Sequence, residues 1–297
     1  HFSVVGRPPM EDSSFGWLIH ELVAPLTPQE FPGLKELHAV DAAGVHPLLL
    51  AIGHERYMPF RERVPEEILT IANRILGTGQ TSLAKFLFIA AADDNPSLDT
   101  HDIPHFFQHF LERVDWTRDL HFQTKTTIDT LDYSGSGWNA GSKVVAACRG
   151  ERRRELKAEL PDNFALPEGF STPQFFQPGI LMIQAPRFEY EKTAREQAME
   201  LCRWLERFDL QHIPLIVLAD DARFTAANLN NFVWVAFTRA NPSHDLYGVQ
   251  AFTEFKHWGC RGPLVIDARK KPHHAPELEI DPSVVQNARK VLERHRF

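Results

Sequence analysis

Uninterrupted apolar runs alternate along the chain with segments in which apolar residues recur at helical spacing. Continuous apolar runs predict buried strands, and apolar stripes at i, i+3 and i+4 predict amphipathic helices. The predicted strands occupy residues 48–52, 86–92, 180–183 and 213–218. The predicted helices occupy residues 68–75, 103–114, 194–205 and 229–237. Strands and helices that alternate in this way indicate βαβ units with sheets covered on both faces, so the predicted fold class is α/β.

The order of elements repeats within the chain. The segment Phe88-Ile-Ala-Ala-Ala-Asp-Asp94 is matched 127 residues later by Leu215-Ile-Val-Leu-Ala-Asp-Asp221, and matches continue into the following helix. Internal similarity of this kind indicates repeated structural units. We therefore predict two tandem α/β domains with largely covered sheets, plus a C-terminal helix. The predicted parts are a lead-in segment at 1–45, a first domain at 46–150, a proline-rich linker at 151–177, and a second domain with the C-terminal helix at 178–297.

The last predicted element is an amphipathic helix at the end of the chain. Asp281 is a plausible N-cap, and Pro282 suits the first helical position. The apolar face consists of Val284, Val285, Ala288, Val291 and Leu292. Such a face needs a partner surface on its own chain or on a neighbouring subunit, and we expect a homo-oligomer.

Composition and charge narrow the classes of partner. The 297 residues are 43% hydrophobic and 24% charged, with a formal net charge of −7, which is ordinary for a folded globular protein. Basic residues gather only at Arg149–Arg154, so nucleic acid is not an expected partner. The longest apolar run, at residues 86–92, is far shorter than the roughly twenty residues that a membrane-spanning helix needs. We expect no membrane span.

The cysteines and the first residue bear on cellular context. Three cysteines without a Cys-x-x-Cys spacing are typical of buried thiols in a reducing compartment, so a cytoplasmic location is expected. The sequence begins with His1 rather than Met and lacks the pattern of a signal peptide. We expect an upstream part to be missing.

Two glycine-rich segments have some features of nucleotide-binding motifs. Gly77-Thr-Gly-Gln-Thr-Ser82 lacks the lysine of a phosphate loop and follows a helix, so that interpretation is rejected. Gly135-Ser-Gly-Trp-Asn-Ala-Gly141 has its third glycine one residue late and precedes a strand, so it is interpreted as a flexible loop. The serines near it have no Gly-x-Ser-x-Gly elbow, which leaves a serine hydrolase without support.

Three charged patterns have a functional and a structural interpretation. The histidines at 101, 105 and 109 have a spacing that suits a transition metal, but no carboxylate completes a His-Glu-x-x-His pattern, so a solvated helix face is favoured and no metal site is predicted. The Arg149–Arg154 cluster could bind an acidic partner, but the favoured interpretation is that it belongs to a solvated linker. The pairs Asp93-Asp94 and Asp220-Asp221 follow strands, where α/β sheets place ligands, although capping of the next turn is favoured.

Several segments, taken in order, resemble those of UbiD-type decarboxylases, which depend on prenylated FMN. They are Gly6-Arg-Pro-Pro9, residues 25–32, Lys85 with the strand into Asp93-Asp94, Thr127–Tyr133 with Gly141-Ser-Lys143, Phe237–Asp245 with its Thr-Arg-x-x-Pro-x-x-Asp pattern, and the strand at 264–268. Between the two copies the resemblance covers nearly the whole chain. It implies that the chain is the carboxy-terminal portion of such an enzyme, with its α/β domain duplicated.

The resemblance implies an activity for the parent protein. The family carries out reversible non-oxidative decarboxylation of aromatic or α,β-unsaturated acids, with quinone biosynthesis as one setting. The implied cofactor is prenylated FMN, with a divalent metal ion and K⁺, bound mainly by a missing N-terminal catalytic half and not by this part alone. The cofactor supplies the difficult chemistry. The family's acid–base network and metal ligands belong to the same half, so no catalytic residue is predicted here.

Three site residues are carried over from the resemblance. Lys85 matches a family lysine that is expected to reach the flavin phosphate, and an ordinary lysine at a strand start is the other interpretation. Ile128 and Leu131 lie in the loop that helps to roof the substrate pocket in relatives, where they would offer apolar contacts. The second copy has His212 in place of Lys85 and no counterpart of residues 127–133, so we expect it to be a structural duplicate.

Two classes of function therefore remain. The first is the carboxy-terminal part of a decarboxylase that acts on a small aromatic or unsaturated acid, supplying oligomerisation and part of the pocket wall. The second is a non-catalytic assembly or binding scaffold, because resemblance in fold does not establish activity.

Overall fold

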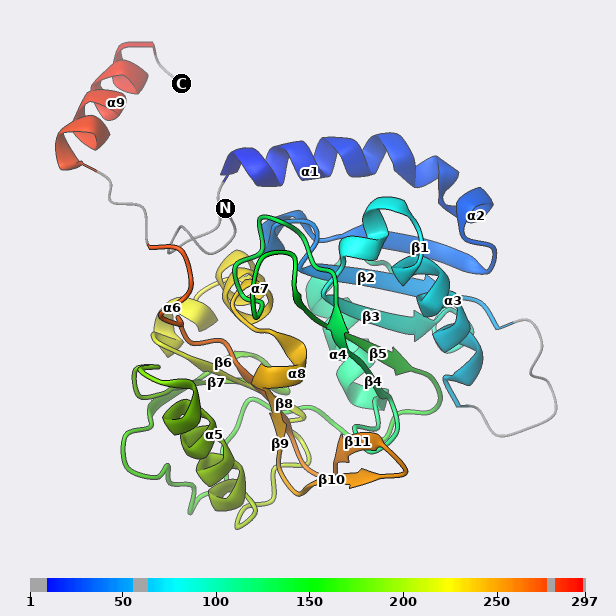
Figure 1. Cartoon of the computed structure of the whole chain (residues 1–297), viewed down its shortest axis with the longest axis vertical. Coiled ribbons are helices and arrows are strands. Elements are labelled where there is room, and N and C mark those ends of the chain that lie inside the picture. Colours follow the sequence, from blue (N-terminus) through cyan, green and yellow to red (C-terminus); the bar gives the residue numbers. More distant parts are fainter. Residues whose placement is uncertain (1–9, 56–63, 277–280, 296–297) are drawn as a thin grey trace.

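The computed structural model describes residues 10–55, 64–276 and 281–295. Its first sheet has five strands in the order β1-β2-β3-β5-β4 (Figure 1). These strands are β1 (Leu34–Ala39), β2 (Leu48–Gly53), β3 (Phe86–Ala91), β4 (Leu120–Thr126) and β5 (Gly141–Cys148). The three inner strands are parallel, and both edge strands are antiparallel. The inner strands are buried along their whole length. The continuous apolar runs of β2 and β3 predict this burial, whereas β5 also buries Ser142 and Lys143.

The second sheet repeats the first in order and direction. Its order is β6-β7-β8-β12-β9, again with parallel inner strands and antiparallel edges. The strands are β6 (Ser171–Gln177), β7 (Ile180–Gln184), β8 (Leu215–Ala219), β9 (Leu246–Gly248) and β12 (Leu264–Asp267). The predicted α/β class is confirmed, and the matching topology gives the sequence repeat a structural basis.

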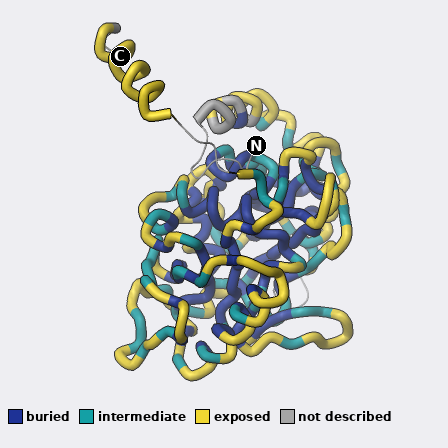
Figure 2. The backbone as a smooth tube through the Cα atoms, turned by 60° about the vertical axis from the view of Figure 1, so that its left-hand side comes forward, coloured by how far each residue is buried: buried dark blue, intermediate teal, exposed yellow. Residues whose placement is uncertain are grey.

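Four helices complete the layers. Helix α3 (Glu66–Leu76) covers the outer face of the first sheet, and α5 (Glu191–Leu205) covers the outer face of the second. Helices α4 (Ile103–Arg113) and α7 (Leu229–Thr238) lie between the sheets and share one buried core. Figure 2 shows the buried backbone gathered in the interior of the molecule. The ring of Phe107 lies 5.7 Å from that of Phe232 within this core. The two copies are therefore joined through their hydrophobic interior.

The remaining elements lie at the ends and edges of this arrangement. They are α1 (Met10–Val23), η1 (Ala24–Leu26), α2 (Thr27–Glu30), η2 (Asp41–Ala43), η3 (Gly79–Leu83), α6 (Ala222–Ala226), α8 (Pro242–Asp245), β10 (Ala251–Glu254), β11 (His257–Cys260) and α9 (Pro282–His295). Strands β10 and β11 form a hairpin between β9 and β12. None of the described helices is both long and apolar enough to cross a bilayer.

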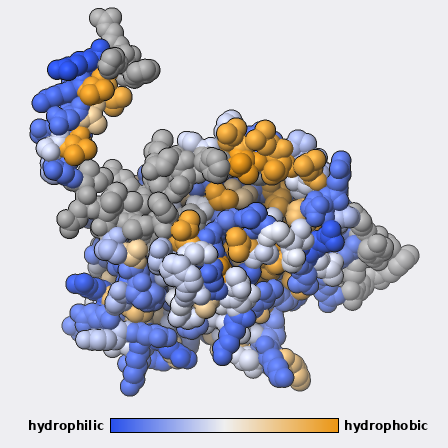
Figure 3. Space-filling view, turned by 45° about the horizontal axis from the view of Figure 1, so that its top comes forward, coloured by the Kyte–Doolittle hydropathy of each residue, from blue (hydrophilic) through white to orange (hydrophobic). Residues whose placement is uncertain are grey.

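Both terminal helices expose apolar side chains. On α1 these include Trp17 and Leu22, and Figure 3 shows that hydrophobic side chains gather on this face of the molecule. On α9 they include Val284 and Val291, and the helix stands away from the two sheets in Figure 1. The predicted apolar face of the C-terminal helix is thus present, and no described residue of the chain covers it.

Two strands extend the sheets beyond the predicted boundaries. Strand β1 lies within the predicted lead-in at 1–45, and β6 lies within the predicted linker at 151–177. Both are partly exposed edge strands, so they lack the continuous apolar run that reveals a buried strand. The boundaries at 46, 150 and 178 stay predictions.

The basic cluster after β5 is attached to a helix end. The Arg154 guanidinium donates to the carbonyl oxygens of Leu111 and Val114 at 2.6 and 2.8 Å, where α4 leaves carbonyls without helical partners. Arg153 pairs with Asp115 at 3.0 Å. The cluster therefore anchors the start of the segment between β5 and β6 to the end of α4. Neither the acidic-partner interpretation nor the solvated-linker interpretation predicted these contacts.

The aspartate pairs bond to backbone, as the favoured interpretation predicts. Asp221 is the N-cap of α6 and accepts from the Phe224 amide at 2.9 Å. In the first copy the Asp94 carboxylate accepts from the Gly150 amide at 2.7 Å. Capping is confirmed for Asp221, and the Asp94 bond ties the residue after β5 to the end of β3.

The histidines at 101, 105 and 109, of which the last two lie on α4, do not form one solvated face. His101 and His105 are exposed, whereas His109 is buried, and burial lowers the pKa of His109 to about 4. The solvated-face interpretation is therefore wrong for His109, because α4 is covered on more than one side. Within the described ranges no group of three or more His, Cys, Asp or Glu side chains is arranged as a metal site.

Candidate functional site

The loop between β4 and β5 packs around a buried isoleucine. Ile128 is 1% exposed and lies beneath Gly135 and Gly141, where an added Cβ would come within 2.7 Å of its Cδ1 atom at either position. At Gly135 the Cβ would also meet the carbonyl oxygen of Ala140 at 2.2 Å. These glycines are needed for packing within the loop, so the segment interpreted as a flexible loop is closely packed.

A buried ion pair anchors this loop to the first sheet. Lys85, just before β3, places its ammonium 2.7 Å from the Asp132 carboxylate, with the side chains 1% and 3% exposed. The ammonium also donates to Ser134 Oγ at 2.6 Å, and Ser134 Oγ donates to the other Asp132 oxygen at 2.6 Å. Burial lowers the pKa of Lys85, and the charge of Asp132 opposes that shift. The three groups form a closed ring of charge-assisted hydrogen bonds.

The same loop is fastened to the second copy. Lys85 donates to the Thr238 carbonyl oxygen at 3.2 Å, and Ser142 at the start of β5 hydrogen-bonds to the side chain of Asn241. The Ser243 amide donates to Ser142 Oγ at 2.8 Å. The end of α7 and the beginning of α8 therefore meet the loop through polar contacts.

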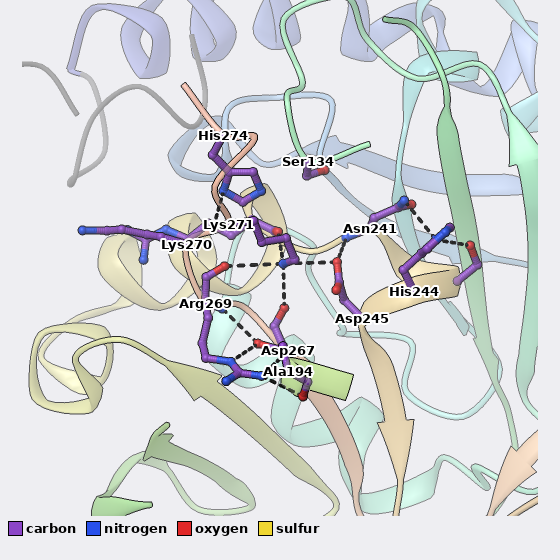
Figure 4. Close-up of polar contacts among 12 residues, drawn as sticks. Ser134, Ala194, Asn241, His244, Asp245, Asp267, Arg269, Lys270, Lys271 and His274 are labelled. Carbon is purple, nitrogen blue, oxygen red and sulfur yellow. Dashed lines mark hydrogen bonds and ion pairs between the residues drawn. The ribbon is translucent and has the colours of Figure 1, made fainter. Parts of the chain in front are cut away.

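A second buried lysine lies close by on the second copy. Lys271 pairs with Asp245 of α8 at 3.2 Å and donates to the Arg239 carbonyl oxygen at 2.9 Å (Figure 4). Asp245 also accepts from the Asn241 amide at 2.6 Å. Burial raises the pKa of Asp245 to about 6, although the charge of Lys271 opposes the shift. Asp245, the last residue of the Thr-Arg-x-x-Pro-x-x-Asp pattern, thus bonds back to the start of α8 and pairs with Lys271 in the segment after β12.

The segment after β12 is held by an arginine and a histidine. Arg269 is fully buried, pairs with Asp267 at 2.7 Å and donates to the Ala194 carbonyl oxygen at 3.0 Å. His274 accepts from the Lys271 amide at 3.3 Å. Burial, followed by the positive charge of Lys271, lowers the pKa of His274 to about 2, so its ring is neutral. Lys271 is therefore held in place from both sides.

One histidine beside this network is oriented by hydrogen bonds. The Asn241 side-chain nitrogen lies 3.1 Å from His244 Nδ1, and Ser243 Oγ lies 3.0 Å from the same atom. His244 is exposed, and Figure 4 shows it beside Asn241 and Asp245. Its ring direction is therefore set by two neighbours while its edge remains accessible.

A cavity of about 1320 Å³ lies between the loop of the first copy and the second copy. The residues that matter for its chemistry are Tyr133, Trp138, Tyr190, Arg195, His244 and Lys271. Thr130, Asp132 and Ser134 of the loop also line it. The cavity is thus bounded by elements of both copies, and its wall includes Asp132 of one buried ion pair and both members of the other, Asp245 and Lys271.

The three predicted site residues are not brought to this cavity together. Lys85 lies behind Asp132, and Ile128 lies inside the loop. Leu131 is 42% exposed but is not among the residues that line the cavity in the described chain. Asp132, Asn241, His244 and Asp245 were missed as individual site residues, although all four lie within the motifs at 127–133 and 237–245 that carry the resemblance.

The described residues do not fit a flavin phosphate at Lys85. A phosphate needs donors with free hydrogen-bonding capacity, whereas the Lys85 ammonium already has three protein partners, one of them a matching carboxylate. Lys271 is committed in the same way to Asp245 and to backbone oxygens. The contact between Lys85 and a flavin phosphate stays a prediction.

The first copy matches a known protein family. Residues 13–148 match the family model of the 3-octaprenyl-4-hydroxybenzoate carboxy-lyase C-terminal domain. This part of the chain belongs to the UbiD family, which confirms the resemblance stated from the motifs. The match covers the first sheet and ends before β6, so the second copy lies beyond the matched residues.

Relatives of similar sequence extend over both copies. An uncharacterized protein of Chlamydia trachomatis is 34% identical over 285 residues, which are 94% of this chain and 44% of that protein. The C subunit of a 4-hydroxybenzoate decarboxylase from Chlamydia pneumoniae is 34% identical over 300 residues, 98% of this chain and 46% of that protein. The chain therefore spans under half the length of these relatives.

Solved structures of UbiD-class enzymes are more distant. The open form of vanillic acid decarboxylase from Sedimentibacter hydroxybenzoicus has a TM-score of 0.35 and 14% identity, covering 50% of this chain and 29% of that chain. The UbiD-class enzyme HmfF from Pelotomaculum thermopropionicum, solved in complex with FMN, has a TM-score of 0.32 and 13% identity, covering 41% of this chain and 24% of that chain.

Proposed function

We propose that this chain is the carboxy-terminal part of a UbiD-like carboxy-lyase that reversibly decarboxylates a small aromatic acid of the hydroxybenzoate type. The observation that carries the proposal is the UbiD C-terminal domain at residues 13–148. The choice of acid rests on the relative named as part of a 4-hydroxybenzoate decarboxylase, which is similar across both copies. A place in quinone biosynthesis is consistent with such an acid.

Within that enzyme, the loop at 127–141 supplies part of the substrate-pocket wall. Leu131 is the exposed apolar residue available for contact, and Ile128 supports the loop from inside. Lys85 acts through Asp132, whose ring of hydrogen bonds keeps the loop in one position. Prenylated FMN, a divalent metal ion and K⁺ are bound mainly by a catalytic half outside this chain. Fixed loops of this kind hold reacting groups in productive geometry.

The test uses the native full-length protein loaded with prenylated FMN. Conversion of 4-hydroxybenzoate to phenol and carbon dioxide is followed by chromatography, together with exchange of labelled bicarbonate for the reverse direction. We expect activity from the full-length protein and none from residues 1–297 alone. The absence of turnover and exchange with every hydroxybenzoate and cinnamate tried would contradict the proposal.

A matched pair of variants tests the role of the loop. Leu131→Ala removes an exposed contact without disturbing a core, so KM for the acid should rise several-fold while the stability of the protein is unchanged. Leu26→Ala removes a comparably exposed leucine from η1 and should leave KM unchanged. Equal kinetics for the two variants would remove Leu131 from the pocket wall.

A second candidate function is a non-catalytic assembly scaffold. The observation that favours it is the pair of terminal helices with exposed apolar faces, α1 and α9. Contiguous apolar faces left open on a folded chain mark contact surfaces. A native protein that self-associates but has no bound flavin and no turnover would support this alternative over the carboxy-lyase.

A further inference from the structure

The large cavity has one wall from the UbiD domain and one wall from the second copy. The first wall is the tightly packed loop that carries Trp138, and the second includes α8 with His244 and the start of α5 with Tyr190. We propose that this cavity binds an aromatic carboxylate, with Trp138 as its stacking surface and His244 Nε2 as its hydrogen-bond donor. The choice of ligand class rests on the proposed function, whereas the site itself rests on the geometry below.

His244 has a defined protonation pattern toward a ligand. Ser142 Oγ accepts from the Ser243 amide and donates to the Asn241 side-chain oxygen, which leaves the Asn241 nitrogen to donate to His244 Nδ1. A neutral imidazole that accepts at Nδ1 carries its proton on Nε2. The described residues supply no partner for that proton. A ligand with a carboxylate oxygen would complete the arrangement.

Trp138 is an exposed aromatic side chain on a rigid support. It is 75% exposed, although Gly135, Ile128 and the Lys85–Asp132 pair hold the loop around it closely. Across the cavity Tyr190 is 71% exposed at the N-cap of α5. Large aromatic side chains left open on fixed backbone lose little conformational entropy when a flat ring packs on them. The combination suits a small aromatic ligand.

The charges of the cavity indicate how the carboxylate is selected. Asp132 and Asp245 are matched by Lys85 and Lys271. Outside these pairs the cavity is lined by Arg195 and Arg203 and by Glu189, Glu191 and Glu206. Because acidic side chains outnumber basic ones outside these pairs, the cavity has no positive field to attract an anion, and a carboxylate is recognised by a directed hydrogen bond from His244.

This site would give the second copy a role of its own. The UbiD domain match ends at residue 148, while His244, Tyr190 and Arg195 all come from later in the chain. The second copy was expected to be a structural duplicate. In the proposed site it supplies the donor side of the cavity, and the first copy supplies the aromatic loop.

The experiment measures binding of 4-hydroxybenzoate to residues 1–297 by calorimetric titration and ligand-detected NMR. We expect saturable binding at one site. His244→Ala should weaken it by about tenfold, as the loss of one hydrogen bond predicts, and His244→Gln, which keeps a donor, should recover part of that loss. Trp138→Ala should also weaken binding several-fold, because the stacking surface is removed.

Matched control variants test whether the loss of 4-hydroxybenzoate binding is specific to the cavity. His105→Ala and Trp17→Ala change exposed residues of the same types on α4 and α1 and should leave binding unchanged. Phenol, which lacks the carboxylate, should bind much more weakly than 4-hydroxybenzoate. The proposal is overturned by non-saturable binding, by His244→Ala and Trp138→Ala variants that bind as the unchanged chain does, or by equal binding of phenol. Because no turnover is measured, this outcome is independent of whether the full-length enzyme is active.

Discussion

The ammonium of Lys85 and the carboxylate of Asp132 are 2.7 Å apart and almost completely enclosed by protein. Lys85 immediately precedes β3, the central strand of the first sheet, and Asp132 belongs to the loop that borders the cavity. The pair therefore connects the position of the loop to the sheet, and removing one partner leaves a buried charge without compensation.

The first prediction concerns that pair. Lys85→Met should lower the free energy of unfolding by about 3–5 kcal/mol, because Asp132 stays buried and unpaired. The double variant Lys85→Met/Asp132→Leu should recover most of the loss, because no uncompensated charge remains. Urea denaturation measures both, with Lys125→Met on the exposed part of β4 as the control. A double variant no more stable than Lys85→Met alone would show that the pair is not the main contribution.

The second prediction compares two glycines of one loop. At Gly135 a Cβ would meet a backbone oxygen at 2.2 Å, whereas at Gly137 the nearest atom is 4.0 Å away. Gly135→Ala should therefore destabilise the protein by about 2 kcal/mol or more and displace the loop, while Gly137→Ala should change stability by less than about 0.5 kcal/mol. Thermal unfolding and amide exchange of residues 130–140 report both effects. Similar values for the two variants would contradict the packing described for this loop.

The third prediction is a pH dependence of stability. The pKa of Asp245 is raised by burial to about 6, from 3.8 in the unfolded chain. Between these values the folded state binds the additional proton, so the contribution of Asp245 is fully present below about pH 4 and is lost as the pH rises through 6. The change is on the order of 3 kcal/mol.

The measurement compares the unchanged chain with Asp245→Asn. The difference in free energy of unfolding between them should vary across pH 4 to 6 and be constant above pH 7. Asp162→Asn, at an exposed position, should give a constant difference throughout. A flat difference for Asp245→Asn would mean that Lys271 holds the carboxylate ionised in this range.

The fourth prediction concerns self-association. Deletion of residues 281–297 should lower the molecular mass in solution, because α9 presents Val284, Val291 and Leu292 to solvent without a described partner on its own chain. Val291→Asp/Leu292→Asp should act in the same direction. Light scattering gives the mass, and an unchanged mass for both proteins would assign the α9 face to another role.

The layers of the fold were largely predictable from local pattern. Continuous apolar runs predict inner strands such as β3 and β8, because burial on both faces leaves no polar position. Strands β1 and β6 were missed because an edge strand in contact with solvent has no such run. The repeat predicted two copies, but spacing along the chain does not show that their cores merge.

The site was predictable only as motifs. The resemblance selected the loop at 127–133 and the segment at 237–245, yet it assigned contacts to Ile128, which the structure buries inside the loop. The partner of Lys85 is 47 residues away in sequence, and the neighbours that orient His244 depend on β5 meeting α8. Such pairings arise from tertiary packing, so a sequence pattern identifies the segments and not the contacts.

The aromatic core between the sheets limits how the duplicated copies can have evolved. Phe88 and Phe107 of the first copy pack against Phe237 and Phe232 of the second. A protein with only one copy would expose this phenylalanine-rich face and would need another surface to cover it. Duplication here has therefore made each copy a permanent partner of the other, and we expect the pair to unfold in a single cooperative transition.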